Sequence, residues 1–226
     1  MHPIDKSGAL ALGRVLMRKT TLLAGLALSL IASARGGTEP TAPLLVRQEV
    51  DEVLARGGRE FQNVTGVFYF FNRGGNDGPS IDLAVDSIRL GLMLGNPRGS
   101  GFFASNYELL GEVFGGAIFQ GPGRVESGAT LFIRYNFIQP HARVIPYLQI
   151  GGGGIYSDIS EHDSRGLVSL PVNFNLQGTG GLRFMANRNC ALLLEAGYRH
   201  ISDASIKLPN RGVDSVGGDV GVGFFF

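Results

Sequence analysis

The segment "VDSVGGDVGVGFFF", residues 213–226, decides the fold. Large apolar side chains alternate along it with small or charged ones. The even-numbered positions carry Val216, Val220, Val222, Phe224 and Phe226, and the odd-numbered positions carry Ser215, Gly217, Asp219, Gly221 and Gly223. Because successive side chains of a strand point to opposite faces, this pattern predicts a β-strand with one apolar face and one polar, glycine-rich face.

The segment before it, "CALLLEAGYRHIS" at residues 190–202, repeats the alternation. Glu195 and Arg199 lie on its odd-numbered face. The even-numbered positions from 190 to 198 carry Cys190, Leu192, Leu194, Ala196 and Tyr198. A soluble barrel would turn its apolar face inward, but here the polar face is dense in glycine and charge. Such a face suits the narrow interior of a small barrel whose outer wall meets lipid. Phe226 ends the chain on the apolar face, as is common in bacterial outer-membrane barrels.

Similar alternation, interrupted by Gly, Pro, Asn and Asp, runs from Glu60 onward. An even number of long strands between turn residues is typical of a meander that closes on itself. The predicted fold is all-β: an eight-stranded antiparallel up-and-down transmembrane β-barrel over residues 59–226. The glycine run at 151–154 lacks a following Lys-Ser/Thr pair, so we interpret it as room for side chains inside the barrel. The eight strands are expected at about 60–72, 79–95, 101–119, 124–138, 143–158, 167–185, 190–202 and 213–226.

The N-terminus has the layout of a secretory signal peptide. Arg14, Arg18 and Lys19 precede the apolar run "TLLAGLALSLIA", and "ASA" at residues 32–34 is a small-residue cleavage site. The apolar run is too short for a confident membrane-spanning helix. We therefore predict a signal peptide over residues 1–34 and an irregular periplasmic segment over residues 35–58.

Composition limits the classes of partner. The full chain of 226 residues has a net charge of +1, and removing residues 1–34 leaves 16 basic against 18 acidic residues. No basic run is interleaved with aromatic residues, so no nucleic acid is expected as a partner. Cys190 is the single cysteine, which excludes an intramolecular disulfide. No metal-ligand spacing occurs, and no metal or other cofactor is expected. His162, between Glu161 and Asp163, is interpreted as part of a solvated loop, with a cation site as the alternative.

The links between the predicted strands suggest an orientation. Links after even-numbered strands are the short ones, "NPRGS", "IQPHA" and "ANRN", and those after odd-numbered strands are mostly longer, with "GPG" as the exception. Outer-membrane barrels have short periplasmic turns and longer extracellular loops. Residues 203–212 are therefore predicted to be extracellular and residues 186–189 periplasmic.

A hydrolytic constellation lies around the last of these loops, in "YRHISDASIKLPNRGVDS" at residues 198–215. His200, Ser202 and Asp214 all belong to the even, outward series. If the hairpin folds symmetrically about Lys207, Asp214 lies across from His200 at a Cβ separation of about 5 Å, and Ser202 lies roughly 7 Å further along the strand. An imidazole can bridge these two groups. A hydrolase on the outer wall at the level of the outer leaflet would meet lipid esters, and the distinctive lipid there is lipopolysaccharide.

These residues resemble a known family, the outer-membrane lipid A 3-O-deacylases, or PagL-like acyloxyacyl hydrolases. The resemblance is carried by Tyr-Arg-His-Ile-Ser at 198–202, by Ala204, by Pro-Asn-x-Gly at 209–212 and by the acid at 214, and more weakly by "VNFNLQGTGGLRF" at 172–184. It implies a serine esterase that removes the 3-position acyl chain of lipid A in the outer leaflet. Carried over residue by residue, it implies the following roles: Ser202 as nucleophile, His200 as base, Asp214 as orienting acid, and Asn210, with the backbone near Asp203 and Ala204, at the oxyanion site.

The chain departs from the family at two positions. Well-known members carry Glu where this chain has Asp214, and Asn where it has Asp203. A misplaced orienting acid lowers the rate, and a carboxylate beside a developing oxyanion opposes catalysis. The alternative function is a non-catalytic structural barrel, in which His200 and Asp214 pair at the membrane interface. A soluble lipid-carrying barrel is disfavoured by the outward apolar face, and the sequence leaves both a monomer and a homodimer open.

Overall fold

The computed structural model describes residues 52–71, 80–139 and 142–226. The predicted signal peptide and most of the predicted N-terminal segment lie outside these residues. The strands are β1 (Arg59–Phe70), β2 (Asp82–Met93), β3 (Ser105–Gln120), β4 (Val125–Phe137), β5 (Val144–Ser157), β6 (Val172–Met185), β7 (Cys190–Ser202) and β8 (Val213–Phe225). The 3-10 helix η2 (Gly101–Phe103) and the short helix α3 (Ile159–His162) lie between these strands.

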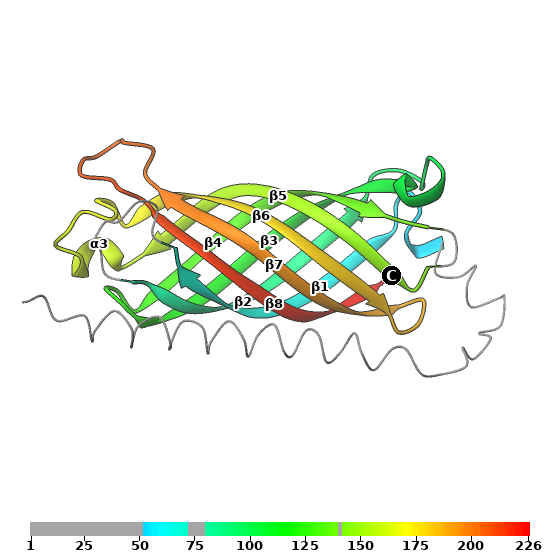
Figure 1. Ribbon diagram of the computed structural model, residues 1–226, viewed down its shortest axis with the longest axis horizontal. Helices are drawn as coiled ribbons and strands as arrows, with labels where there is room; N and C mark the ends of the chain where they lie inside the picture. Colours follow the sequence, from blue (N-terminus) through cyan, green and yellow to red (C-terminus); the bar gives the residue numbers. More distant parts are fainter. Residues whose placement is uncertain (1–51, 72–79, 140–141) are drawn as a thin grey trace, which may run out of the picture. The chain divides into compact units, whose positions relative to one another are not determined.

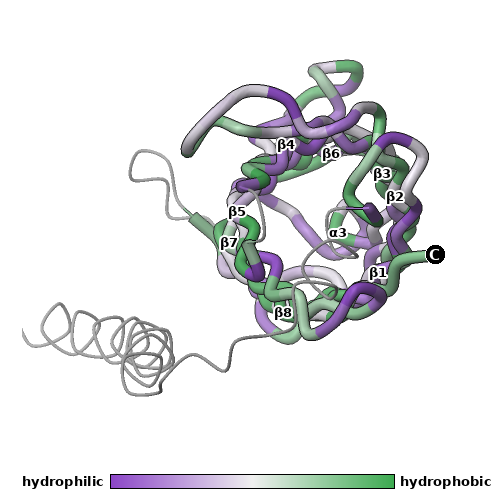
Figure 2. Tube along the Cα trace, turned by 90° about the vertical axis from the view of Figure 1, so that its right-hand side faces the viewer, coloured by the Kyte–Doolittle hydropathy of each residue, from purple (hydrophilic) through white to green (hydrophobic). Residues whose placement is uncertain are grey.

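The eight strands form a closed antiparallel barrel (Figure 1). Each strand pairs with its neighbours in the chain, and β1 closes the barrel by pairing with β8 from Glu60↔Phe225 to Phe70↔Ser215. The view in Figure 2 shows these strands as a ring. Closure removes the unpaired edges that an open sheet would expose. The predicted eight-stranded transmembrane barrel is thus confirmed.

The two faces of the wall are as predicted. Leu192 and Val220 point outward and are 55% and 61% exposed, whereas Glu195, Arg199 and Asp219 are buried inside. Each strand from β2 to β8 carries large exposed apolar side chains on this outer face. Within the described residues, no helix is long and apolar enough to cross a membrane.

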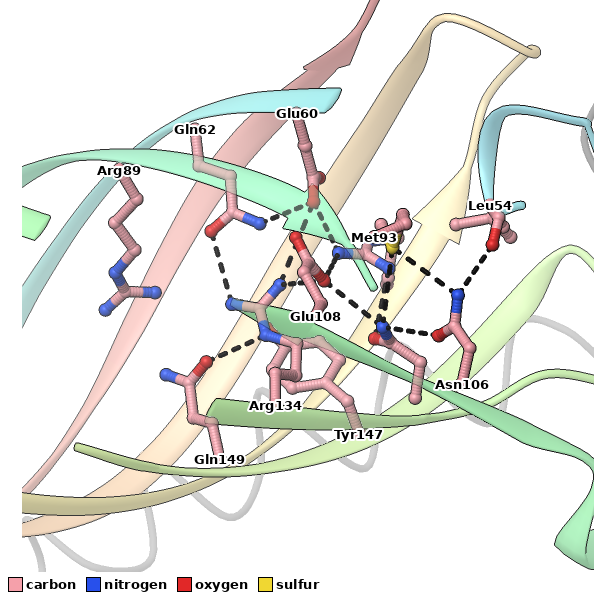
Figure 3. Close-up of polar contacts among 12 residues, drawn as sticks. Leu54, Glu60, Gln62, Arg89, Met93, Asn106, Glu108, Arg134, Tyr147 and Gln149 are labelled. Carbon is pink, nitrogen blue, oxygen red and sulfur yellow. Dashed lines mark hydrogen bonds and ion pairs between the residues drawn. The ribbon is translucent and has the colours of Figure 1, made fainter. Parts of the chain in front are cut away.

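Ion pairs and hydrogen bonds link side chains inside the barrel, and Figure 3 shows those around Glu60, Glu108 and Arg134. Arg89 Nη1 donates to both oxygens of Glu195 at 2.8 and 2.9 Å, and its Nε donates to Glu112 at 2.7 Å. The Tyr147 hydroxyl donates to Glu195 at 2.6 Å, and the Arg134 guanidinium lies 4.1 Å from the centre of the Tyr147 ring. Buried charges are costly unless they are paired, and here Arg89 and Arg134 both form ion pairs with Glu195 across the lumen.

Apolar clusters close both ends of this polar interior. The cluster at the α3 end includes Ile81, Leu83, Ile155, Leu167 and Ile201, and the one at the C-terminal end includes Leu54, Met93, Ile145, Met185 and Phe225. Glycine makes room for the larger inner side chains: a Cβ at Gly151 would lie 2.4 Å from the Phe132 ring, and one at Gly181 would lie 2.4 Å from the Tyr147 ring. Side chains therefore fill the interior of the barrel.

The links differ from the sequence expectation at two places. β3 begins at Ser105 and not near residue 101, because η2 occupies Gly101–Phe103. The β2–β3 link therefore covers residues 94–104 and is not short. β6 begins at Val172, directly after Pro171, so the β5–β6 link covers residues 158–171 and contains α3. Short links after even-numbered strands remain at 138–143 and 186–189.

Candidate active site

The β7–β8 hairpin brings together the three residues of the predicted triad. His200 pairs with Asp214 across the two strands, as the symmetric hairpin predicted. Ser202 ends β7 on the same outward face, two residues beyond His200. Because β-strand side chains alternate, this register places all three side chains on the outside of the barrel at its α3 end.

The contacts form a continuous chain from acid to hydroxyl. His200 Nδ1 lies 2.7 Å from Asp214 Oδ1, and His200 Nε2 lies 3.1 Å from Ser202 Oγ. A carboxylate can only accept here, so Nδ1 carries the proton and Nε2 is left to accept from the serine hydroxyl. The His200 side chain is 29% exposed and that of Asp214 13%, so the acid is the more shielded of the two. This arrangement can activate a serine for attack on a carbonyl.

Tyr198 belongs to the same cluster, although sequence reasoning gave it no role. Its hydroxyl donates to Oδ1 of Asp214, the same oxygen that faces His200. The signal was present in the sequence. Tyr198 lies two residues before His200 on the same face of β7, and an aromatic side chain can reach the diagonal neighbour on the next strand.

Gly212 provides the surface against which the imidazole packs. Its φ of +75° lies in the left-handed region, and a Cβ there would lie 2.8 Å from His200 Cε1. The Gly212 N–H donates to the Leu167 carbonyl at 2.9 Å, and the Arg211 N–H donates to the Gly166 carbonyl at 3.2 Å. The β5–β6 link thus supports the β7–β8 link next to His200.

The predicted oxyanion residues lie on the loop that follows Ser202. Ala204 and Ser205 have φ of 54° and 64°, so the chain turns sharply just after Ser202. The Asn210 side-chain carbonyl accepts weakly from the Asp203 N–H at 3.5 Å, which leaves the Asn210 amide nitrogen to donate elsewhere. The loop therefore brings Asn210 and the backbone N–H groups near Ala204 to the end of β7.

Asp203 occupies a different face from the triad. Its side chain is 1% exposed on the inner side of the wall, and within the described part of the chain neither carboxylate oxygen has a hydrogen-bond partner. The strand alternation explains this, because residue 203 continues the odd, inward series of β7. Only its backbone is shared with the candidate oxyanion site.

Two other polar groups of the barrel differ from the cluster around His200. On the outer wall, Asp86 accepts hydrogen bonds from Thr65 at 2.5 Å and from Asn63 at 3.2 Å, a cluster without a histidine. In the β5–β6 link, His162 Nδ1 lies 2.9 Å from the carbonyl oxygen of Asp158. Across the described residues, no group of three or more His, Cys, Asp or Glu side chains could hold a metal ion.

Two solved structures align with most of this chain. The crystal structure of Neisserial surface protein A aligns with a TM-score of 0.50 and 17% identity over 76% of this chain and 100% of that chain, which supports the fold alone. The crystal structure of the outer membrane enzyme PagL gives a TM-score of 0.49 and 14% identity over 72% of this chain and 97% of that chain. A search of curated proteins found no match.

A protein-family model gives the more specific result. The model of lipid A 3-O-deacylase (PagL) matches residues 92–223. The matched region is more than half of the 226-residue chain, and it contains the complete segment from Tyr198 to Asp214. The chain therefore belongs to the lipid A 3-O-deacylase family of outer-membrane barrels.

Proposed function

We propose that the protein is a serine esterase of the outer membrane that removes the ester-linked acyl chain at the 3-position of lipid A. The observation that carries the proposal is the continuous contact from Asp214 through His200 to Ser202 on the outer wall of the barrel. Membership of the deacylase family supports the substrate class. Lipopolysaccharide of the outer leaflet is then the partner, with residues 203–212 on the extracellular side.

The triad geometry supports a two-step hydrolysis. Ser202 Oγ attacks the acyl carbonyl while His200 Nε2 takes the hydroxyl proton, and Asp214 stabilises the imidazolium that forms. The tetrahedral intermediate then breaks its bond to the sugar oxygen. This oxygen takes from His200 the proton that came from Ser202, and it leaves as the free 3-hydroxyl. Water, deprotonated by His200, then hydrolyses the acyl-serine and releases the fatty acid.

The surroundings supply oxyanion stabilisation and positioning. The Asn210 amide and the backbone N–H groups near Ala204 would donate to the negative charge that develops on the carbonyl oxygen. The scissile acyl chain would lie along the outward side chains of Leu194, Ala196 and Val216. Because the bilayer already aligns acyl chains with this wall, embedding the enzyme in the leaflet does much of the positioning.

The alternative is a non-catalytic structural barrel. The cluster of Asp86, Thr65 and Asn63 favours it, because this cluster shows that the outer wall carries hydrogen-bonded polar groups that lack a nucleophile–base pair. In that case His200 and Asp214 would form only another such pair.

Mass spectrometry of lipid A from cells that express the protein separates the two functions. Wild type should yield lipid A that lacks one acyl chain, and Ser202→Ala or His200→Ala should lower the rate by at least about 10⁴-fold. Ser127→Ala is the matched control, since Ser127 also lies exposed on the outer wall, in β4. Deacylation by the Ser202→Ala protein at the wild-type rate would refute the nucleophile. No deacylation by wild type, given suitably acylated lipid A, would favour the structural barrel.

A further inference from the structure

We infer that Tyr198 is a positioning residue of the triad, which holds the Asp214 carboxylate in the orientation that His200 requires. The inference rests on the proposed esterase function and adds a fourth side chain to its machinery. It starts from one observation: the Tyr198 hydroxyl and the His200 imidazole both engage Oδ1 of Asp214.

The strand register places both groups at this one oxygen. His200 and Tyr198 are separated by two residues on the outward face of β7, and their partners on β8 are Asp214 and Val216. Tyr198 is therefore the diagonal neighbour of Asp214, at a separation that long aromatic side chains can span. The contact follows from strand pairing and does not depend on a loop.

An aspartate in this position benefits from a second donor. The terminal torsion of an Asp side chain has a broad energy minimum, so the His200 contact alone leaves the carboxylate plane free to rotate. A carboxylate oxygen has two lone pairs and can accept from the tyrosine and from the imidazole together. Two donors that converge on Oδ1 limit that rotation, and hydrogen bonds to an ionised group are among the stronger ones in proteins.

The role predicts an effect on the chemical step. Asp214 matters most when the imidazolium forms, because it orients His200 and offsets its new charge. Tyr198 acts on the acid and does not contact the scissile ester in the proposed mechanism. Removal of its hydroxyl should therefore lower kcat and leave KM unchanged.

The test is the Tyr198→Phe variant, which deletes the hydroxyl and keeps the ring. With lipid A in detergent micelles, kcat should fall about tenfold with KM within twofold. Tyr107→Phe is the matched control, since Tyr107 is a 54%-exposed outward tyrosine at the other end of the barrel, and its kcat should not change. If each variant migrates on a gel differently before and after heating, as a folded barrel does, both variants fold.

A second readout does not depend on turnover. In the Ser202→Ala background, the NMR resonance of the His200 Nδ1 proton is identified by its loss in His200→Gln. Tyr198→Phe should shift this resonance, and Tyr107→Phe should not. An unshifted resonance together with unchanged kcat, or a raised KM with unchanged kcat, would overturn the positioning role. Absence of deacylation by wild type would refute the proposed function instead, and the resonance would still report whether Tyr198 orients the Asp214–His200 pair.

Discussion

Arg183 is the side chain on which the buried charge network should depend most. Its Nη2 donates to Glu108 at 3.1 Å and also to Glu60, and its Nη1 donates to Asn136 at 3.2 Å. The side chains of Arg183, Glu60 and Glu108 are completely buried. Replacement by methionine keeps an apolar stem of similar length but removes the charge, so that two carboxylates remain with Arg134, 3.6 to 3.8 Å away, as their nearest cation.

The expected magnitude follows from breaking a buried pair. Removal of one partner of such a pair typically costs about 3–5 kcal/mol, because the other charge is left uncompensated. Total stabilities of folded proteins are about 5–15 kcal/mol. Arg183→Met should therefore remove roughly a fifth or more of the free energy of unfolding. The double variant Arg183→Met/Glu108→Gln removes one carboxylate as well, and it should recover at least half of the loss.

Urea unfolding of the purified barrel in detergent micelles measures this effect, with the fraction of folded protein read from gel mobility without heating. Arg59→Met is the control, because Arg59 is an exposed arginine at the start of β1. It should change the free energy of unfolding by less than about 0.5 kcal/mol. A loss below about 1 kcal/mol in Arg183→Met, or a double variant no more stable than the single one, would refute the view that these pairs support the interior.

Three further predictions concern the α3 end of the barrel. Gly212→Ala should lower deacylation at least about tenfold, because the added Cβ would displace the His200 ring. The control is Gly57→Ala, which has a similar φ of +88° and nothing within 4 Å of its added Cβ, so it should lower only the free energy of unfolding, by about 1–2 kcal/mol. Equal losses of activity in the two variants would contradict this prediction. Asp203→Asn should raise the urea midpoint by removing an uncompensated buried charge, without a loss of deacylation, and a lower midpoint would count against that reading. For Asp158, burial acts to raise the pKa, but backbone N–H groups of residues 124 and 125 and the nearby His162 outweigh it and hold the pKa below its ordinary value. Its contribution to stability is therefore present above about pH 4 and is lost as the pH falls through the lowered pKa. Asp158→Asn should reduce the urea midpoint at pH 7 and have a smaller effect in acid. A difference between the wild-type and Asp158→Asn midpoints that grows in acid would contradict this prediction.

The sequence was informative wherever strand periodicity alone determines a position. Alternation in 213–226 was enough to predict the outward and inward faces of β8, and hairpin symmetry about Lys207 was enough to pair His200 with Asp214. Alternation also places Asp203 on the inner face, although sequence reasoning had considered its charge only beside the oxyanion. In each case the side chain's place follows from counting residues along one hairpin.

Contacts across the lumen could not be predicted in the same way. Arg183 on β6 meets Glu60 on β1, and Arg89 on β2 meets Glu195 on β7, and neither pair lies on adjacent strands. Which inward side chains meet depends on the tilt and stagger of the closed barrel, and those quantities are not encoded in the alternation of any single strand. The start of β3 was missed for a related reason, because the turn of η2 depends on glycine conformations at Gly99 and Gly101 that alternation does not report.

The outer-wall position of the candidate triad helps to choose between the proposed esterase and the structural barrel. Ionisable side chains that face lipid are costly and are usually retained for function. Two acids of the strands face outward, Asp86 and Asp214, and both accept hydrogen bonds from neighbouring side chains. A group that only provides hydrogen bonds to an outward carboxylate needs no more than such donors, as at Asp86. At Asp214 the contacts extend beyond the hydrogen bonds that the carboxylate itself needs. The second imidazole nitrogen of His200 lies 3.1 Å from the Ser202 hydroxyl. A non-catalytic structural barrel has no need of that additional contact, whereas a serine nucleophile requires a base at this position.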